Sequence, residues 1–283
     1  MERMSSWLLL GMLFTATGVR ADTAEEASAY MVPQNIQDFY QELRGRTETV
    51  CQNVLADGFY STDTGANTTS YCTNNPHKPS ILFLAGKAGA LSNMDIDCDG
   101  VQGGPSDDGR CSIEKSPDYQ SATAFRDELR RYNVPGVSDL NPYIHPYVVF
   151  GNSAEDPAKK KNWKVFDPQK YGVRPLSVMA VVCPSDNNKR GERKLVYGIW
   201  GDTNGDDGTK PMVGEVSISL ATACRGKNMT GYRGYDGDDV LYIAFAGKEA
   251  VPGPKGADWA AKDYEAFERS IRPLGDKLVV KMK

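Results

Sequence analysis

Apolar residues recur along this chain at two different spacings, and each spacing predicts a type of element. Over 33–43 they fall at i, i+3, i+4 and i+7, which is one face of an α-helix. The same helical spacing returns over 122–132 and, more clearly, over 258–271. Helices are therefore expected in these three segments.

Between the helical segments, short apolar runs alternate with turn residues. Several runs are rich in Val, Ile and Tyr and have the length of a β-strand. The segment 57–80, rich in Gly, Asn, Ser, Thr and Pro, is expected to be a loop. The predicted strands are Ile81–Ala85, Tyr147–Phe150, Leu176–Cys183, Leu195–Trp200, Val213–Leu220 and Asp239–Phe245.

These elements predict a mainly β (α+β) fold. We expect one domain, 22–283, with a β-barrel-like core and peripheral helices near its two ends. A double-psi barrel is the form that analogy suggests.

The first residues indicate export. The apolar run Trp7–Phe14 is too short to cross a bilayer, which needs about 20 residues. Arg3 precedes the run, and Val19-Arg20-Ala21 has the small residues of a signal-peptidase site. Residues 1–21 are therefore interpreted as a signal peptide, and the protein is expected to be secreted and extracellular.

The six cysteines fit that compartment. None lies in a C-x-x-C pair, and the chain has only two histidines, so disulfides are favoured over a structural zinc site. Fifteen pairings are open, of which Cys98–Cys111, closing a short loop, is the most natural. Glycosylation sequons begin at Asn67 and Asn228.

Composition narrows the class of partner. The chain has 283 residues, is 40% hydrophobic and carries a net charge of −4. This apolar share is enough for a sizeable core, and the acidic balance argues against a nucleic-acid partner. We expect a monomer with no membrane partner.

The densest polar cluster follows the predicted strand 195–200. Asp202 lies just past that strand, and Glu215 begins the next apolar run. If that run is extended, alternation turns Glu215 away from the packed face. A helix beginning at Ser217 would still leave Glu215 near the loop that carries Asp202. In either case two carboxylates can converge.

Paired carboxylates are typical of glycoside hydrolysis, in which one protonates the leaving oxygen and the other activates water or attacks the sugar. Tyr197 and Trp200 would offer flat faces on which sugar rings stack. The plain alternative is an acidic turn between two strands. The other polar candidates for substrate binding in this turn are Asn204, Asp206 and Asp207.

A second acidic cluster consists of Asp95, Asp97 and Asp99. Its spacing begins like an EF-hand loop, but Ser106 stands at the twelfth position, where that loop needs Glu. A looser calcium site, an acidic wall for a cationic sugar and a disulfide-pinned acidic loop all remain open. No cofactor and no metal is predicted, and no G-x-S-x-G or G-x-G-x-x-G motif is in place.

Several blocks of the chain, in order, carry a recognisable pattern. They are Asn93–Gly100, Ile144–Asn152, Val178–Cys183, Tyr197–Gly208, Gly214–Thr222, Asp239–Phe245 and Leu274–Leu278. These blocks resemble the fungal endo-chitosanases of glycoside hydrolase family 75, and the resemblance covers nearly all of the chain after residue 21. Val216 after Glu215 and Arg225 after Cys224 depart from the family pattern, outside the acidic pair.

The resemblance implies an endo-acting hydrolase of the β-1,4 bonds of chitosan that inverts the anomeric carbon. It also implies that Asp202 and Glu215 are the catalytic pair. Which is acid and which is base stays open; by analogy we assign Glu215 as the acid and Asp202 as the base. Asp95, Asp97, Asp99, Asp206 and Asp207 are the expected contacts for ammonium groups of chitosan polymer and oligosaccharides.

Two other functions are weighed against this one. The first is a non-catalytic polysaccharide-binding or wall-loosening β-barrel protein, which would release no reducing ends. The second is a calcium-dependent extracellular module, whose melting temperature would respond to EDTA.

Overall fold

The computed structural model describes residues 31–62, 64–112, 116, 119–154, 163–184, 193–205 and 208–282. The signal peptide predicted over 1–21 and the candidates Asp206 and Asp207 lie outside these residues. All elements named below belong to the unit Val32–Lys283. The helices are α2 (Gln34–Arg44), α3 (Arg126–Arg130), α4 (Ile218–Arg225) and α5 (Tyr264–Val280). The strands are β1 (Asn53–Phe59), β2 (Thr69–Thr73), β3 (Ile81–Gly86), β4 (Ser92–Asp97), β5 (Tyr147–Ser153), β6 (Val178–Pro184), β7 (Arg193–Gly205), β8 (Glu215–Ser217) and β9 (Tyr235–Phe245).

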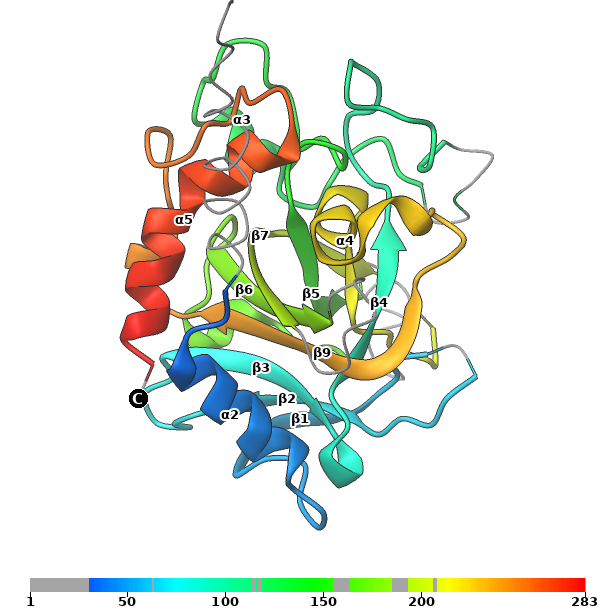
Figure 1. Ribbon diagram of the computed structural model, residues 1–283, viewed down its shortest axis with the longest axis vertical. Coiled ribbons are helices and arrows are strands. Elements are labelled where there is room, and N and C mark those ends of the chain that lie inside the picture. The colour runs from blue at the N-terminus through cyan, green and yellow to red at the C-terminus, as the bar shows by residue number, and fades with distance from the viewer. Residues whose placement is uncertain are drawn as a thin grey trace, which may run out of the picture. The chain divides into compact units, whose positions relative to one another are not determined.

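Six of these strands close into a barrel. The sheet order is β1-β2-β3-β9-β4-β8-β5-β7-β6, and β6 also pairs with β9, which joins β4 through β9 into a ring. Strands β1 to β3 extend from β9 as an antiparallel sheet at one side of the ring (Figure 1). The pairs β4–β8 and β5–β7 are parallel. The predicted β-barrel-like core is confirmed, and its double-psi form stays a prediction.

The two terminal helices lie where their apolar faces can be buried. Helix α2 buries Ile36, Tyr40 and Leu43 and lies against the β1–β3 sheet (Figure 1). Helix α5 begins at the N-cap Asp263, whose side chain accepts a hydrogen bond from the Ala266 N–H at 2.7 Å. It packs against β6 and β7. The prediction of helices near the two ends is confirmed.

Three expectations about the elements need correction. The segment 57–80 is not all loop, because it holds the end of β1 and all of β2. Strand β2 is buried between β1 and β3 although its side chains are mostly polar. The run 213–220 is a short strand followed by a helix, and Ser217 caps that helix, as the alternative reading had it. Strands β1 and β4 were not predicted at all, although Met94 and Ile96 alternate with acidic residues along β4.

Three disulfides tie these elements together: Cys51–Cys72, Cys98–Cys111 and Cys183–Cys224. The expected Cys98–Cys111 pairing is confirmed. The sequon residues Asn67 and Asn228 are both exposed. Across the described ranges, the helices all fall short of the length and apolarity that crossing a bilayer requires.

Candidate active site

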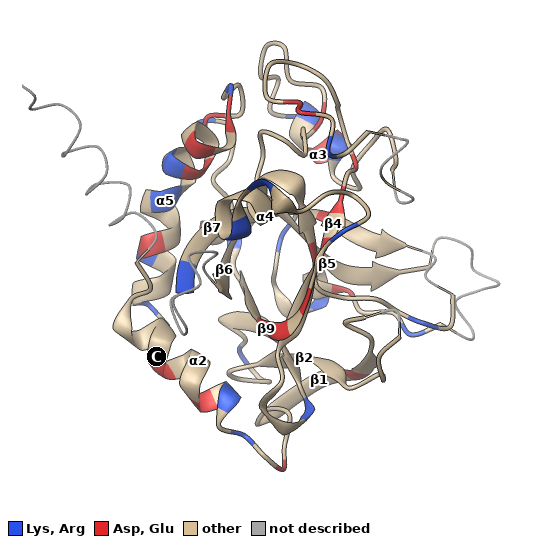
Figure 2. Cartoon of the chain, turned by 45° about the vertical axis from the view of Figure 1, so that its right-hand side comes forward, with Lys and Arg blue, Asp and Glu red and all other residues tan. Residues whose placement is uncertain are grey.

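Four neighbouring strands bring three carboxylates into one row. Asp95 on β4 is level with Glu215 on β8, Glu215 is level with Val149 on β5, and Val149 is level with Asp202 on β7. Residues level with one another on paired strands project from the same face of a sheet. We call Asp95, Glu215, Val149 and Asp202 the acid row. Figure 2 shows acidic residues on β4.

The next residues along the same strands form an apolar row. Ile96, Val216, Val148 and Trp200 are level with one another and are at most 5% exposed. Because side chains alternate along a strand, the packed core takes this row and leaves the acid row on the opposite face. Glu215 and Asp95 are half-buried, whereas Val149 and Asp202 of the same row are each 4% exposed, so the acid row is more open at its β4–β8 end.

Asp202 lies inside β7 rather than just past its end. A bulge at Gly201 shifts the register between β5 and β7, so that Trp200 pairs with Val148 and Asp202 with Val149. The backbone N–H groups of Ala124 and Thr203 donate to Asp202 Oδ1 at 3.1 and 2.7 Å. These hydrogen bonds fix the orientation of the carboxylate and favour its ionised form.

Glu215 stands between a glycine and a helix start. Gly214 before it has φ +98°, and the Gly214 carbonyl accepts from the Asp95 N–H at 2.8 Å and the Tyr242 hydroxyl at 3.2 Å. Ser217 after it caps α4 by accepting from the Leu220 N–H at 3.3 Å. The backbone on both sides of Glu215 is therefore anchored.

A tighter group of acids lies beside the acid row. Carboxylate oxygens of Asp97, Asp99 and Asp202 all lie within 4.8 Å of one another. All three side chains are buried, at 4%, 5% and 4% exposed. We call these three residues the carboxylate cluster. Among the residues that the structure describes, this cluster is the group of side chains close enough to hold a metal ion.

Within the carboxylate cluster, the Asp97 carboxyl has a raised pKa. Burial, followed by the charges of Asp202, Asp99 and Glu215, raises the pKa of the Asp97 carboxyl well above its usual range. Burial and the same carboxylates, Asp97 included, raise the pKa of Tyr147. The Tyr147 hydroxyl donates to the Asp99 carbonyl at 3.0 Å and therefore stays neutral.

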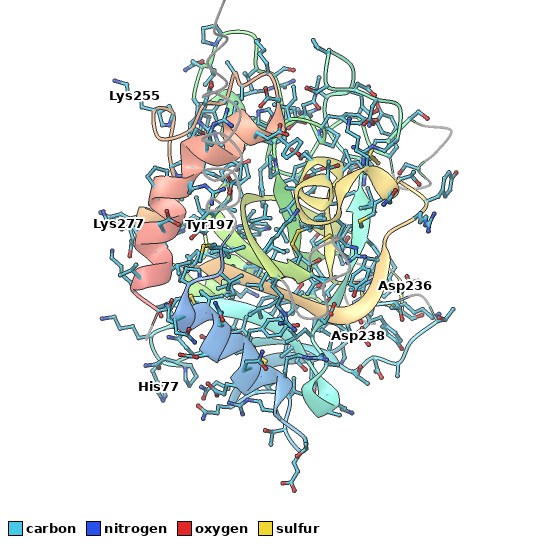
Figure 3. The ribbon with its side chains drawn as sticks, viewed as in Figure 1. His77, Tyr197, Asp236, Asp238, Lys255 and Lys277 are labelled. Carbon is cyan, nitrogen blue, oxygen red and sulfur yellow. A yellow bond between two sulfur atoms is a disulfide. The ribbon has the colours of Figure 1, made fainter. Side chains whose placement is uncertain are left out.

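The stacking role expected of two aromatic residues does not fit their positions. Tyr197 is 0% exposed, and its hydroxyl donates to the Asp276 carboxylate of α5 at 2.8 Å. Figure 3 shows Tyr197 beside α5. Trp200 is 1% exposed, belongs to the apolar row and packs edge-on against Phe125 at 4.7 Å. Neither ring offers a free face to a sugar, because alternation along β7 turns Tyr197 to α5 and Trp200 into the core.

The remaining candidate in the turn is Asn204, which is half-buried. Its side-chain amide donates to the Met212 carbonyl at 2.9 Å and so helps to hold the segment before Glu215. Sequence reasoning missed Asn93, whose amide donates to Asp95 Oδ2 at 2.8 Å, and the buried hydroxyls of Tyr147 and Tyr242. The alternation along β4 was the signal that could have identified this strand as part of the site.

Comparison with known proteins identifies the family of the chain. A family model described as fungal chitosanase of glycosyl hydrolase group 75 matches residues 94–281. The chain belongs to this family. The matched range contains the acid row and the carboxylate cluster.

Individual relatives extend the match toward the N-terminus. Endo-chitosanase B of Aspergillus oryzae (strain ATCC 42149 / RIB 40) is 42% identical over 258 residues, which is 91% of this chain and 94% of that protein. The endo-chitosanase of Aspergillus fumigatus is 42% identical over 259 residues, with the same coverage of 91% and 94%. Endo-chitosanase C of Aspergillus oryzae is 29% identical over 190 residues, 67% of this chain but 39% of that protein. The resemblance noted in the sequence is thus confirmed for this group 75 chain.

Proposed function

We propose that this protein is a secreted endo-chitosanase that hydrolyses the β-1,4 bonds of chitosan with inversion at the anomeric carbon. Family membership and two relatives named endo-chitosanase, each 42% identical to this chain, support the substrate. Asp202 and Glu215 are the proposed catalytic pair.

The reaction assigns a different state to each carboxyl group. Glu215, protonated, gives its proton to the leaving glycosidic oxygen. Asp202, ionised, takes a proton from the water whose oxygen forms the new bond to the anomeric carbon from the opposite side. The two N–H groups that donate to Asp202 support its ionised state.

The observation that carries this proposal is that the strand register places Glu215 and Asp202 on the same face of the sheet. One strand, β5, lies between them, so their backbones stand about 9.6 Å apart at a strand spacing of about 4.8 Å. Inversion requires carboxyl groups about 6.5–9.5 Å apart, to leave room for water, whereas retention requires about 5–5.5 Å. Inversion is proposed from the family resemblance and not from the backbone spacing. Between the pair, Val149 presents only an aliphatic side chain.

The charge of the site suits the proposed substrate. Chitosan carries ammonium groups at mildly acidic pH, and carboxylates attract them more than they attract N-acetylated units. Asp95 is half-buried on the acid row, level with Glu215, and is the proposed ammonium contact nearest the acid. The exposed Asp236 and Asp238 of β9, the strand beside β4, add negative charge outside the row (Figure 3).

The last part of the proposal is that the protein is secreted. The signal peptide at 1–21 would bring the chain to an oxidising compartment, where three disulfides are stable. Exposure of Asn67 and Asn228 makes both sequons accessible to glycosylation.

The test compares wild type with Glu215→Gln and Asp202→Asn on chitosans of defined acetylation. Each variant should lose about 10²–10⁴-fold in kcat while still binding oligosaccharide in calorimetry. Proton NMR of fresh wild-type products should show the inverted anomer.

Other results would contradict the proposal. Retained anomeric configuration would refute inversion. Polysaccharide binding without release of reducing ends from wild type would favour the non-catalytic alternative.

A further inference from the structure

The carboxylate cluster holds more negative charge than a buried site tolerates. Oxygens of Asp97, Asp99 and Asp202 lie within 4.8 Å of one another, and all three side chains are at least 95% buried. Like charges this close in a low-dielectric setting repel strongly, so the three groups do not all ionise together. Either a proton or a cation must compensate them.

The hydrogen bonds show that Asp202 is the member least suited to carry a proton. Asp202 Oδ1 accepts from two backbone N–H groups, and Asp99 Oδ1 accepts from the Gln120 N–H at 2.5 Å. Such donors favour the ionised form of a carboxyl group. Asp97 Oδ1 accepts a single N–H, from Asp99 at 2.6 Å.

Asp97 lies close to three other acids of the site. The groups that face Asp97 are Asp99 just beyond β4, Glu215 on β8, Asp202 on β7 and the Tyr147 hydroxyl from β5. Burial and the three carboxylates act in the same direction, which is to keep the Asp97 carboxyl protonated.

We propose that Asp97 is a positioning residue that stays protonated while the enzyme works, and that it thereby leaves Asp202 ionised to act as the base. This role rests on the proposed function, and it differs from the role of an ammonium contact or a metal ligand. Both of those would require an ionised Asp97. The proton on Asp97 is not transferred in the reaction. It neutralises the Asp97 carboxylate, whose negative charge would otherwise raise the pKa of Asp202 and favour protonation of the base.

The distinguishing variant is Asp97→Asn, whose neutral amide has the shape and the donor capacity of a protonated carboxyl. We expect Asp97→Asn to keep kcat within about tenfold of wild type, whereas Asp202→Asn loses about 10²–10⁴-fold. Glu268→Gln is the control for loss of a buried carboxyl outside the site. Glu268 is 1% exposed, lies on α5, pairs with Arg272 and accepts from the Tyr197 N–H. If Asp97→Asn does not fold, Asp97→Ser supplies a neutral donor in its place.

A second readout reports the proton without using activity. Below pH 4 both the folded and the unfolded protein protonate Asp97, and above that pH only the folded protein does. The stabilisation that this proton gives the wild type is therefore lost as the pH rises. The Tm of Asp97→Asn should rise relative to wild type as the pH increases above about 4. The infrared band of one protonated carboxyl, present in wild type at the pH of the activity assay, should be absent from Asp97→Asn.

The outcomes are separable. A loss of kcat in Asp97→Asn as large as that in Asp202→Asn, with no change in the pH dependence of Tm, would overturn the proposal. A rise of wild-type Tm with CaCl₂ that Asp97→Asn abolishes would overturn it in favour of a cation. If the wild type cleaves no chitosan, the proposed function fails, while the infrared and Tm measurements still decide whether Asp97 carries a proton.

Discussion

Gly214→Ala should damage both stability and catalysis, because the residue before Glu215 has no room for a side chain. An added Cβ would lie 2.4 Å from Asn93 Oδ1 and 2.4 Å from Ser92 Oγ, and both side chains are buried. Gly214 also has φ +98°, a conformation that L-residues rarely adopt. The backbone strain costs about 1–3 kcal/mol and the overpacking about 1–3 kcal/mol more.

The matched control is Gly136→Ala. Gly136 has φ +77° but nothing within 4 Å of an added Cβ, so it carries the backbone cost without the clash. The difference in Tm between the two variants isolates the clash. At about 2–4 °C per kcal/mol for a domain of this size, Gly214→Ala should melt roughly 2–12 °C below Gly136→Ala.

Catalysis supplies the second readout. Relief of the clash moves Gly214 or Asn93, and these two residues hold Glu215 and Asp95. A misplacement of about 1 Å can cost about 10²-fold in rate, so kcat on chitosan should fall between about ten- and a hundredfold in Gly214→Ala. Gly136→Ala should retain kcat within about twofold. Equal Tm losses in the two variants, with kcat of Gly214→Ala unchanged, would refute the reasoning.

Two further predictions concern stability. His145 is 3% exposed, and burial lowers its pKa from 6.5 to about 4. The stabilisation that comes from keeping His145 neutral is therefore fully present above pH 6.5 and is lost as the pH falls to 4, a change of about 3 kcal/mol. Calorimetry should detect this loss as a fall in Tm with decreasing pH. The His145→Gln variant should show a smaller fall. The Cys183–Cys224 disulfide closes a separation of 41 residues. Replacing both cysteines by Ser should lower the free energy of unfolding by about 4 kcal/mol in urea titrations, and a loss below about 1 kcal/mol would contradict the loop-entropy estimate.

Much of the sheet could be predicted because its strands carry a local signal. Strands β3, β5, β6 and β9 coincide with apolar runs rich in residues that favour strands. Burial on both faces makes such strands read as continuous apolar runs. The expected strands were therefore mostly right in place, if not in length.

Strands β1, β2 and β4 were not predicted. Strands β2 and β4 show the reason, because tertiary contacts decide their conformation. The polar side chains of β2 are buried by pairing with β1 and β3, and the Cys51–Cys72 bridge holds the strand in place. Strand β4 carries acids for the site among its apolar residues. In both cases long-range pairing overrides local propensity.

The sequence by itself determined the alternation that separates Glu215 from Val216 and the location of Asp202 in a polar stretch after apolar residues. It also supplied six cysteines that favour disulfides, but not their pairing. Only the tertiary structure decided that β4 brings Asp95 level with Glu215 and places Asp97 beside Asp202. It also decided that Tyr197 packs under α5 instead of lining the site. The physical reason is that alternation is a property of one strand, whereas the register between strands depends on residues far apart in the chain and on a bulge at Gly201.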